Sequence, residues 1–152
     1  RGLSQARDFN GLTAALGLVY QITKNDTYAQ RLKKEMLNVA AFPDWKFDEQ
    51  FLAVSEFTFG AALGLDWAWD TYTQQERDLI ATSMLKNGFE KAIGVYENTL
   101  IPKNPIGPWP YWPTALTNWN FVCNGGIGIA LLTVLNDFPH IITQEQQTKI
   151  IQ

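Results

Sequence analysis

The chain has 152 residues, of which 46% are hydrophobic and 18% charged, and its formal net charge is -3. This composition is typical of a folded globular domain with its own core, which excludes a disordered or fibrous chain. With a pI near 5.1 and no cluster of Lys and Arg, the chain lacks the basic surface that nucleic acid requires, so we expect no nucleic-acid partner.

Membrane insertion and cysteine chemistry are equally disfavoured. Asp66 and Asp70 interrupt the longest apolar candidate, so no run reaches the roughly 18 to 20 residues of a membrane span, and we expect no membrane partner. Cys123 is the only cysteine, which excludes an internal disulfide and a cysteine-based zinc site. We expect neither a metal nor a cofactor.

The ends of the sequence suggest a piece of a longer protein. The chain starts at Arg1 without Met or a signal-peptide pattern, and it stops at Gln152 shortly after a new helix is expected to begin. We therefore expect residues 1–152 to be a single but partial domain, so the absence of an export signal from this sequence carries no information.

Apolar residues recur every three to four positions along most of the chain, which predicts helices. Asp26 is a candidate N-cap of the second helix, and Thr73 and Thr143 each open a capping box with a Glu or Gln three residues later. No segment shows the alternation typical of a strand. The expected helices span residues 3–23, 26–42, 48–69, 74–96 and 119–135, with a sixth after 143.

Two kinds of helix alternate in this order. The helices over 48–69 and 119–135 are rich in small apolar residues, whereas those over 26–42 and 74–96 carry Lys, Glu and Arg. This difference indicates inner and outer layers of a curved array. The fold class that we predict is all-α, an incomplete (α/α) toroid made of antiparallel helical hairpins.

The connection over residues 98–117 holds five of the seven prolines, and its aromatic content argues against disorder. Prolines fix their own φ and push the preceding residue towards an extended backbone, so large rings are displayed with little freedom. Such a loop suits the face of a sugar. The rings are those of Trp109, Tyr111 and Trp112.

Three asparagines follow this loop within seven positions: Asn118, Asn120 and Asn124. An amide offers donors and an acceptor without charge, which suits a site that binds a carboxylate or several hydroxyls. A structural interpretation also stands: Asn118 as a helix N-cap, Asn120 as a first-turn residue and Trp119 packed in the core.

The order of these features resembles the helical toroid domain of the heparinase II/III-like polysaccharide lyases. The likeness covers roughly residues 48–139 and is strongest in the segment NWNFVCNGG. It is carried by AALGLDWAWD (61–70), Leu79 and Ile80, residues 109–112, and NWNFVCNGG (118–126).

The resemblance implies an enzyme that cleaves uronate-containing glycans by β-elimination. Asn118 resembles the catalytic residue that faces the uronate carboxylate, and Asn120 and Asn124 would assist it. The remaining substrate-binding candidates resemble sugar-platform residues: Trp109, Tyr111, Trp112 and Trp119.

The family pattern also places parts outside this sequence. Its catalytic Tyr would lie beyond Gln152, and a β-sandwich domain would follow, so we expect the fragment alone to be inactive. The resemblance implies an acidic polysaccharide or oligosaccharide as partner and a periplasmic or secreted location.

The other polar candidates lie outside the aromatic loop and the asparagine segment. Glu56 lies in the apolar helix over 48–69. If it points into a cleft, it is a substrate-binding candidate. The alternative is that it bonds to the backbone of a neighbouring helix. Asp66 and Asp70 lack a third ligand, so a helix-end cap and a core hydrogen bond are favoured over a metal site. We expect His140 to be an ordinary surface residue and Cys123 to pack as a small hydrophobe.

Two other functions remain open. An α/α-barrel glycoside hydrolase would need two carboxylates near a cleft, for which Glu56 and Asp66 are the only pair that the sequence suggests. A helical-repeat interaction module would show recurrence at about 34 residues, and no such period is visible.

Overall fold

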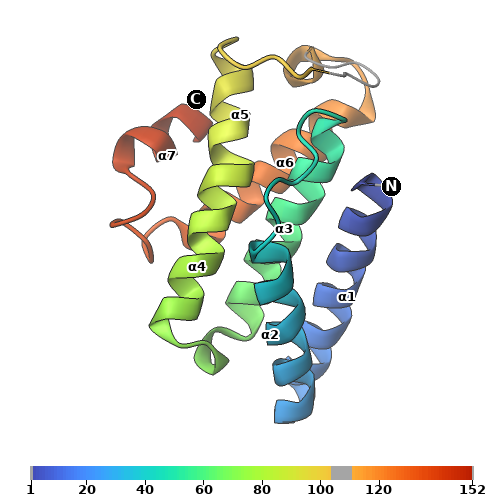
Figure 1. Cartoon of the computed structure of the whole chain (residues 1–152), viewed down its shortest axis with the longest axis vertical. Helices are drawn as coiled ribbons and strands as arrows, with labels where there is room; N and C mark the ends of the chain where they lie inside the picture. The colour runs from blue at the N-terminus through green and yellow to red at the C-terminus, as the bar shows by residue number, and fades with distance from the viewer. Residues whose placement is uncertain (1, 104–110, 152) are drawn as a thin grey trace.

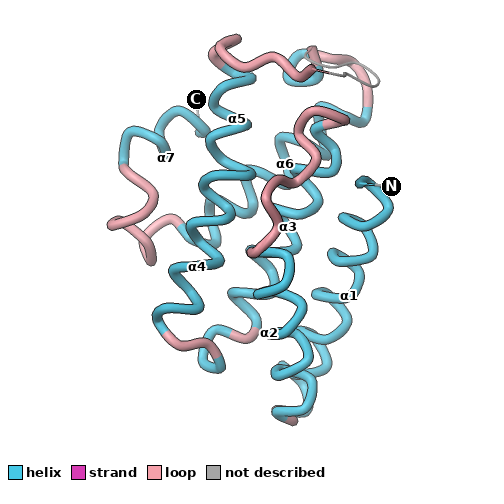
Figure 2. Tube along the Cα trace, viewed as in Figure 1, coloured by secondary structure: helices cyan, strands magenta, loops and turns pink. Residues whose placement is uncertain are grey.

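The computed structural model describes residues 2–103 and 111–151. All regular structure in this part of the chain is helical, and Figure 2 shows the helices joined by loops without a strand between them. The all-α class predicted from the sequence is therefore confirmed. None of the described helices combines the length and the apolar character that crossing a membrane requires.

The observed helices follow the predicted order closely. Helix α4 continues through one π-helical stretch, η2, into α5, so that the helix predicted over 74–96 is continuous. The elements are α1 Gly2–Thr23, α2 Asp26–Ala40, α3 Phe51–Trp67, η1 Trp69–Thr71, α4 Gln74–Met84, η2 Leu85–Phe89, α5 Glu90–Tyr96, η3 Trp112–Thr114, α6 Asn118–Val134 and α7 Gln144–Ile151.

Local hydrogen bonds explain where several helices begin. Thr73 accepts from the Glu76 amide and Glu76 accepts from the Thr73 amide, so the predicted capping box of α4 is confirmed. At α7, Thr143 and Gln146 exchange the same two bonds. The expected N-cap of α2 was wrong by one residue, because Asn25 has the extended backbone of a cap and accepts from the amide of Thr27.

The start of α3 was predicted three residues too early. Lys46 has a φ of 67°, in the left-handed region, and its amide donates to the side chain of Asp44. This local side-chain bond favours a turn over a helix, so the residues after it form turns until α3 begins at Phe51.

Helix α3 lies between α1 and α6 and packs along both, and these three helices form one layer. Helices α2 and α4 pack against this layer on one side, and α7 contacts α5 and α6 (Figure 1). Almost every side of α3 is buried as a result. The two helices that the sequence identified as rich in small residues, α3 and α6, are thus direct neighbours.

A close approach of α3 and α6 depends on Gly126. The Ser55 hydroxyl of α3 donates to the carbonyl of Val122 at 2.8 Å, and a Cβ on Gly126 would lie 3.1 Å from the Ser55 carbonyl oxygen. Gly126 therefore allows close packing of the two helices. The neighbouring Gly125 does not take part, because a Cβ there would meet nothing within 4 Å.

Candidate functional site

The first turn of α6 presents Asn118 to solvent. Its side chain makes no hydrogen bond to any residue that the structure describes. The N-cap of α6 is Thr117, whose backbone is extended, so the alternative of Asn118 as the cap was wrong. Asn118 is the first helical residue, and an amide there is free to meet a ligand.

The helical period places Asn118 on the same side of α6 as Phe121, Val122 and Gly125, which follow it by three, four and seven residues. That side of α6 faces a groove of about 270 Å³ between α6, α3 and α1, which we call the α6 groove. Its lining consists of Asn10, Ser55, Glu56, Phe59, Phe121, Val122, Gly125, Gly126 and Ile129.

Glu56 is the acidic group of the α6 groove. Two side chains of α1 hold it: Asn10 donates from Nδ2 to Oε2 at 2.7 Å, and the Nε of Arg7 lies 3.7 Å from Oε1. The Glu56 side chain is 18% exposed, so part of the carboxylate still faces the groove. Its interactions are therefore with side chains of α1, and the alternative of a partner for a neighbouring backbone was wrong.

Asn120 and Asn124 lie on another side of α6. The Tyr96 hydroxyl donates to Oδ1 of Asn124 at 2.9 Å, and Nδ2 of Asn124 donates to Oδ1 of Asn120 at 3.4 Å. Asn120 donates in turn to the carbonyl of Pro113 at 2.6 Å. This chain of hydrogen bonds ties α5, α6 and the loop before α6 together, so both amides have structural partners.

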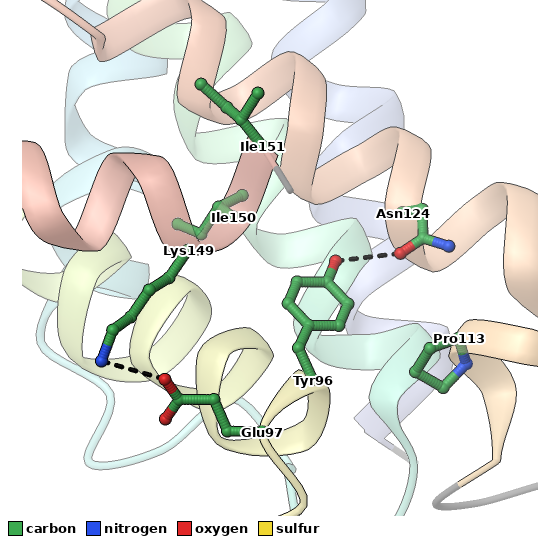
Figure 3. Close-up of a pocket in the computed structure, with 7 residues that line it drawn as sticks. All are labelled: Tyr96, Glu97, Pro113, Asn124, Lys149, Ile150 and Ile151. Carbon is green, nitrogen blue, oxygen red and sulfur yellow. Dashed lines mark hydrogen bonds and ion pairs between the residues drawn. The ribbon is translucent and has the colours of Figure 1, made fainter.

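Tyr96 and Asn124 line a second pocket of about 640 Å³, which we call the Tyr96 pocket. Figure 3 shows the hydroxyl of Tyr96 pointing at Asn124 on one side and Glu97 paired with Lys149 on the other. The lining is completed by Pro113, Ile150 and Ile151.

The charges of the Tyr96 pocket are paired. The ammonium of Lys149 lies 2.9 Å from Glu97 and 3.3 Å from Glu145, and these contacts raise its pKa. Burial raises the pKa of Tyr96 well above its usual value, so this phenol stays protonated at neutral pH. The described lining of the pocket offers a hydroxyl, an amide and paired charges, and it contains no unpaired cation for an acidic ligand.

The aromatic loop does not present its rings as the sequence predicted. Trp112 is 0% exposed, with its ring stacked on Phe51 at a centroid distance of 4.4 Å and packed near Tyr96 at 5.7 Å. A buried indole cannot serve as a sugar platform, so that prediction for Trp112 was wrong. The physical reason is that η3 turns the ring inwards, where burying a large apolar surface is favourable.

The other three rings differ from Trp112. Tyr111 is 74% exposed, which leaves its face available. Trp119 is half-buried and packs against the core, in line with the structural interpretation of this ring. Trp109 lies outside the described residues.

The remaining polar candidates have ordinary partners. The Tyr20 hydroxyl lies 3.1 Å from both carboxylate oxygens of Asp70, which confirms the expected hydrogen bond to the core. His140 is exposed and lies 3.0 Å from Asp78. Cys123 is buried, and burial raises the pKa of its thiol, as expected for a packing residue. Among the described residues, no group of three or more His, Cys, Asp and Glu side chains could hold a metal ion.

Sequence reasoning missed three contributors. Arg7 and Asn10 are polar residues of the helix expected over 3–23, and nothing in their spacing distinguishes a groove from open solvent. Tyr96 ends the α4–α5 helix just before the aromatic loop. No pattern in the sequence links Tyr96 to Asn124, which lies 28 residues later, and only the packing of α5 and α6 brings the two together.

The sequence matches no model of a known protein family, and no curated protein matches it either.

Proposed function

We propose that the chain binds a uronate-bearing glycan along the α6 groove, as the sugar-binding part of a polysaccharide lyase that acts by β-elimination. The observation that carries this proposal is the solvent-exposed amide of Asn118 at the start of α6, on the side of the helix that faces the groove. The groove supplies a carboxylate and an amide for sugar hydroxyls and two phenyl rings for the sugar face.

The chemistry gives the amide a defined role. Removing the proton α to a uronate carboxylate creates additional negative charge on the carboxylate oxygens. Donors aimed at those oxygens lower the barrier because they bind the charge as it develops. Asn118 is such a donor, and its position in the first turn of α6 adds the favourable field of the helix N-terminus.

In this proposal the layer of α1, α3 and α6 is the inner wall of an incomplete (α/α) toroid, and α2, α4–α5 and α7 are its outer wall. Further helices carrying the base, and a β-sandwich, would complete the enzyme. The periplasmic or secreted location belongs to the same proposal and depends on the resemblance alone.

The carboxylate pair suggested for a glycoside hydrolase is too widely separated to act. Glu56 and Asp66 both lie on α3, ten residues apart, which corresponds to about 15 Å along the helix axis. Glycosidase carboxylates are separated by roughly 5 to 9.5 Å, so this pair cannot act on one glycosidic bond.

The proposal predicts that uronate oligosaccharides bind and that Asn118→Ala weakens this binding about ten-fold or more, since a hydrogen bond to a charged group is lost. Isothermal titration calorimetry of the chain with an unsulfated uronate hexasaccharide measures the effect. Asn136→Ala is the matched control, because Asn136 is also exposed and lies just beyond the other end of α6.

Equal affinity of the parent and the Asn118 variant would contradict the proposal. The reaction class is tested by incubating the protein with uronate polymers. A lyase releases an unsaturated product that absorbs in the ultraviolet, whereas new reducing ends without that absorbance indicate a hydrolase.

A further inference from the structure

The solvent-facing side of α6 is apolar over about three helical turns. Phe121 is 81% exposed, Ile129 52% and Leu132 67%, although all three are large hydrophobic residues. Together they form a patch of roughly a few hundred Å², the size at which an exposed apolar surface on a monomer marks an interaction site. We call these residues, with Gly125 and Gly128 between them, the α6 stripe.

Four positions of the α6 stripe have the spacing of a helix–helix seam. Phe121, Gly125, Gly128 and Leu132 are separated by four, three and four residues, which places them on one line along the helix. A Cβ on either glycine would meet nothing within 4 Å, so the middle of this line is open to the backbone of another helix. The order along the line is large, small, small, large.

This order is symmetric about the midpoint between Gly125 and Gly128, which suits an isologous contact between identical surfaces. Two helices that cross are closest at the crossing point and diverge on either side of it. A two-fold axis through the midpoint brings the glycines of two copies together where the helices are closest. It also sets each Phe121 against Leu132 of the other copy, where the helices diverge and large side chains fill the gap.

We propose that the α6 stripe binds the α6 stripe of a second copy of this chain, as an antiparallel pair about a two-fold axis. The proposal goes beyond the glycan site and does not depend on it. Because Phe121 also lines the α6 groove, the dimer and a bound glycan compete for this side chain. The measurements below therefore contain no glycan.

Charge favours a second copy over a charged partner. Helix α6 has no Asp, Glu, Lys or Arg from Asn118 to Val134, so two copies bring no like charges together at the contact although the net charge of the chain is -3. A strongly acidic or basic partner would find no opposite charge on this helix. The contact therefore depends on apolar burial and close packing, which a second α6 supplies.

The area of the α6 stripe indicates a weak dimer. Two patches of this size bury less than the roughly 1,200 Å² of a standard interface, which is the range of transient contacts. We expect a reversible dimer with a dissociation constant of roughly 10 to 100 μM.

Sedimentation equilibrium of the chain between about 5 and 500 μM tests this expectation. The weight-average mass should rise from the 17.2 kDa of one chain towards twice that value and then stop. A mass that stays at the monomer value throughout would overturn the proposal. A mass that rises past the dimer would also overturn it, because an isologous contact closes after two copies.

Phe121→Asp and Leu132→Asp should each raise the dissociation constant at least about ten-fold, since each variant buries a charge without a partner in the dimer. Both side chains are largely exposed in the single chain, so circular dichroism should show an unchanged fold. Leu79→Asp is the matched control, because Leu79 is 48% exposed and lies on α4, which packs on one side of the layer of α1, α3 and α6. Equal weakening by the control would indicate non-specific association and contradict the proposal.

An exchange of charges tests the antiparallel arrangement. Phe121→Asp and Leu132→Lys should each self-associate poorly. An equimolar mixture of the two variants should dimerise at least about ten-fold more tightly than either alone, because the introduced carboxylate then faces the introduced ammonium. A parallel pair would instead bring each position to its own copy, so a mixture no tighter than its components would overturn the antiparallel pairing.

Discussion

Tyr111 and Trp112 are neighbours with opposite environments. Tyr111 is largely exposed, whereas Trp112 is fully buried against Phe51 and its Nε1 has no hydrogen-bond partner among the described residues. Leaving a buried N–H unpaired costs free energy, so the burial of the large apolar ring must more than offset that cost. Trp112 is therefore a packing residue, and Tyr111 is the ring of this pair that is free to meet a ligand.

Trp112→Ala is expected to lower the free energy of unfolding by about 3 to 5 kcal/mol, the usual cost of removing a buried ring. Tyr111→Ala should change it by less than about 0.5 kcal/mol, because an exposed side chain leaves no cavity. Urea unfolding of both variants measures the difference. Similar losses for the two would contradict the burial of Trp112.

The three sides of helix α6 have different contacts. One side packs on α3 through Gly126 and Cys123. Another carries Asn124, which accepts a hydrogen bond from Tyr96, and the third, with Asn118, faces the α6 groove. The glycine pair illustrates the difference, because Gly126 is pressed against Ser55 whereas Gly125 faces open space.

Gly126→Ala is expected to destabilise the fold by about 1 to 3 kcal/mol, because the added methyl group meets the backbone of α3 and the helices must separate. Gly125→Ala should instead stabilise it by roughly 0.5 to 1 kcal/mol, since alanine favours a helix and has room here. Thermal or urea unfolding of the two variants and the parent chain measures these changes in stability. A gain in stability for Gly126→Ala would show that α3 and α6 are not in close contact.

The whole molecule is organised around α3, which contacts α1, α2, α4 and α6. Helix α7 differs, because it packs mainly on α5 and α6 and has a single buried residue among those described, Gln147. Local opening costs least where few apolar contacts must be broken. The layers seen in Figure 1 therefore imply a gradient of local stability from α3 outwards.

Amide hydrogen exchange should follow this gradient. The amides of α3 are expected to exchange slowest, near the rate set by global unfolding, and those of α7 much faster through local opening. Mass spectrometry of peptides covering the two helices measures the rates. Equal protection of α3 and α7 would contradict the central position of α3, and α2, which packs on one side of the layer, serves as an intermediate reference.

Most of the helices could be predicted from the sequence because their signals are local. Apolar periodicity and two capping boxes placed α4 and α7 correctly, and the errors at the starts of α2 and α3 came from side-chain bonds within turns. The small apolar residues of the helix over 48–69 also indicated an inner helix, and α3 is buried on nearly every side.

The site depended on tertiary structure, because a residue type does not determine which way a side chain points. The sequence by itself determined the all-α class and singled out Asn118 and Glu56 by their chemistry. Only the packing of α1, α3 and α6 brought Arg7 and Asn10 to Glu56, and only the path of the loop buried Trp112. These arrangements follow from contacts between residues distant in the chain, which local patterns do not encode.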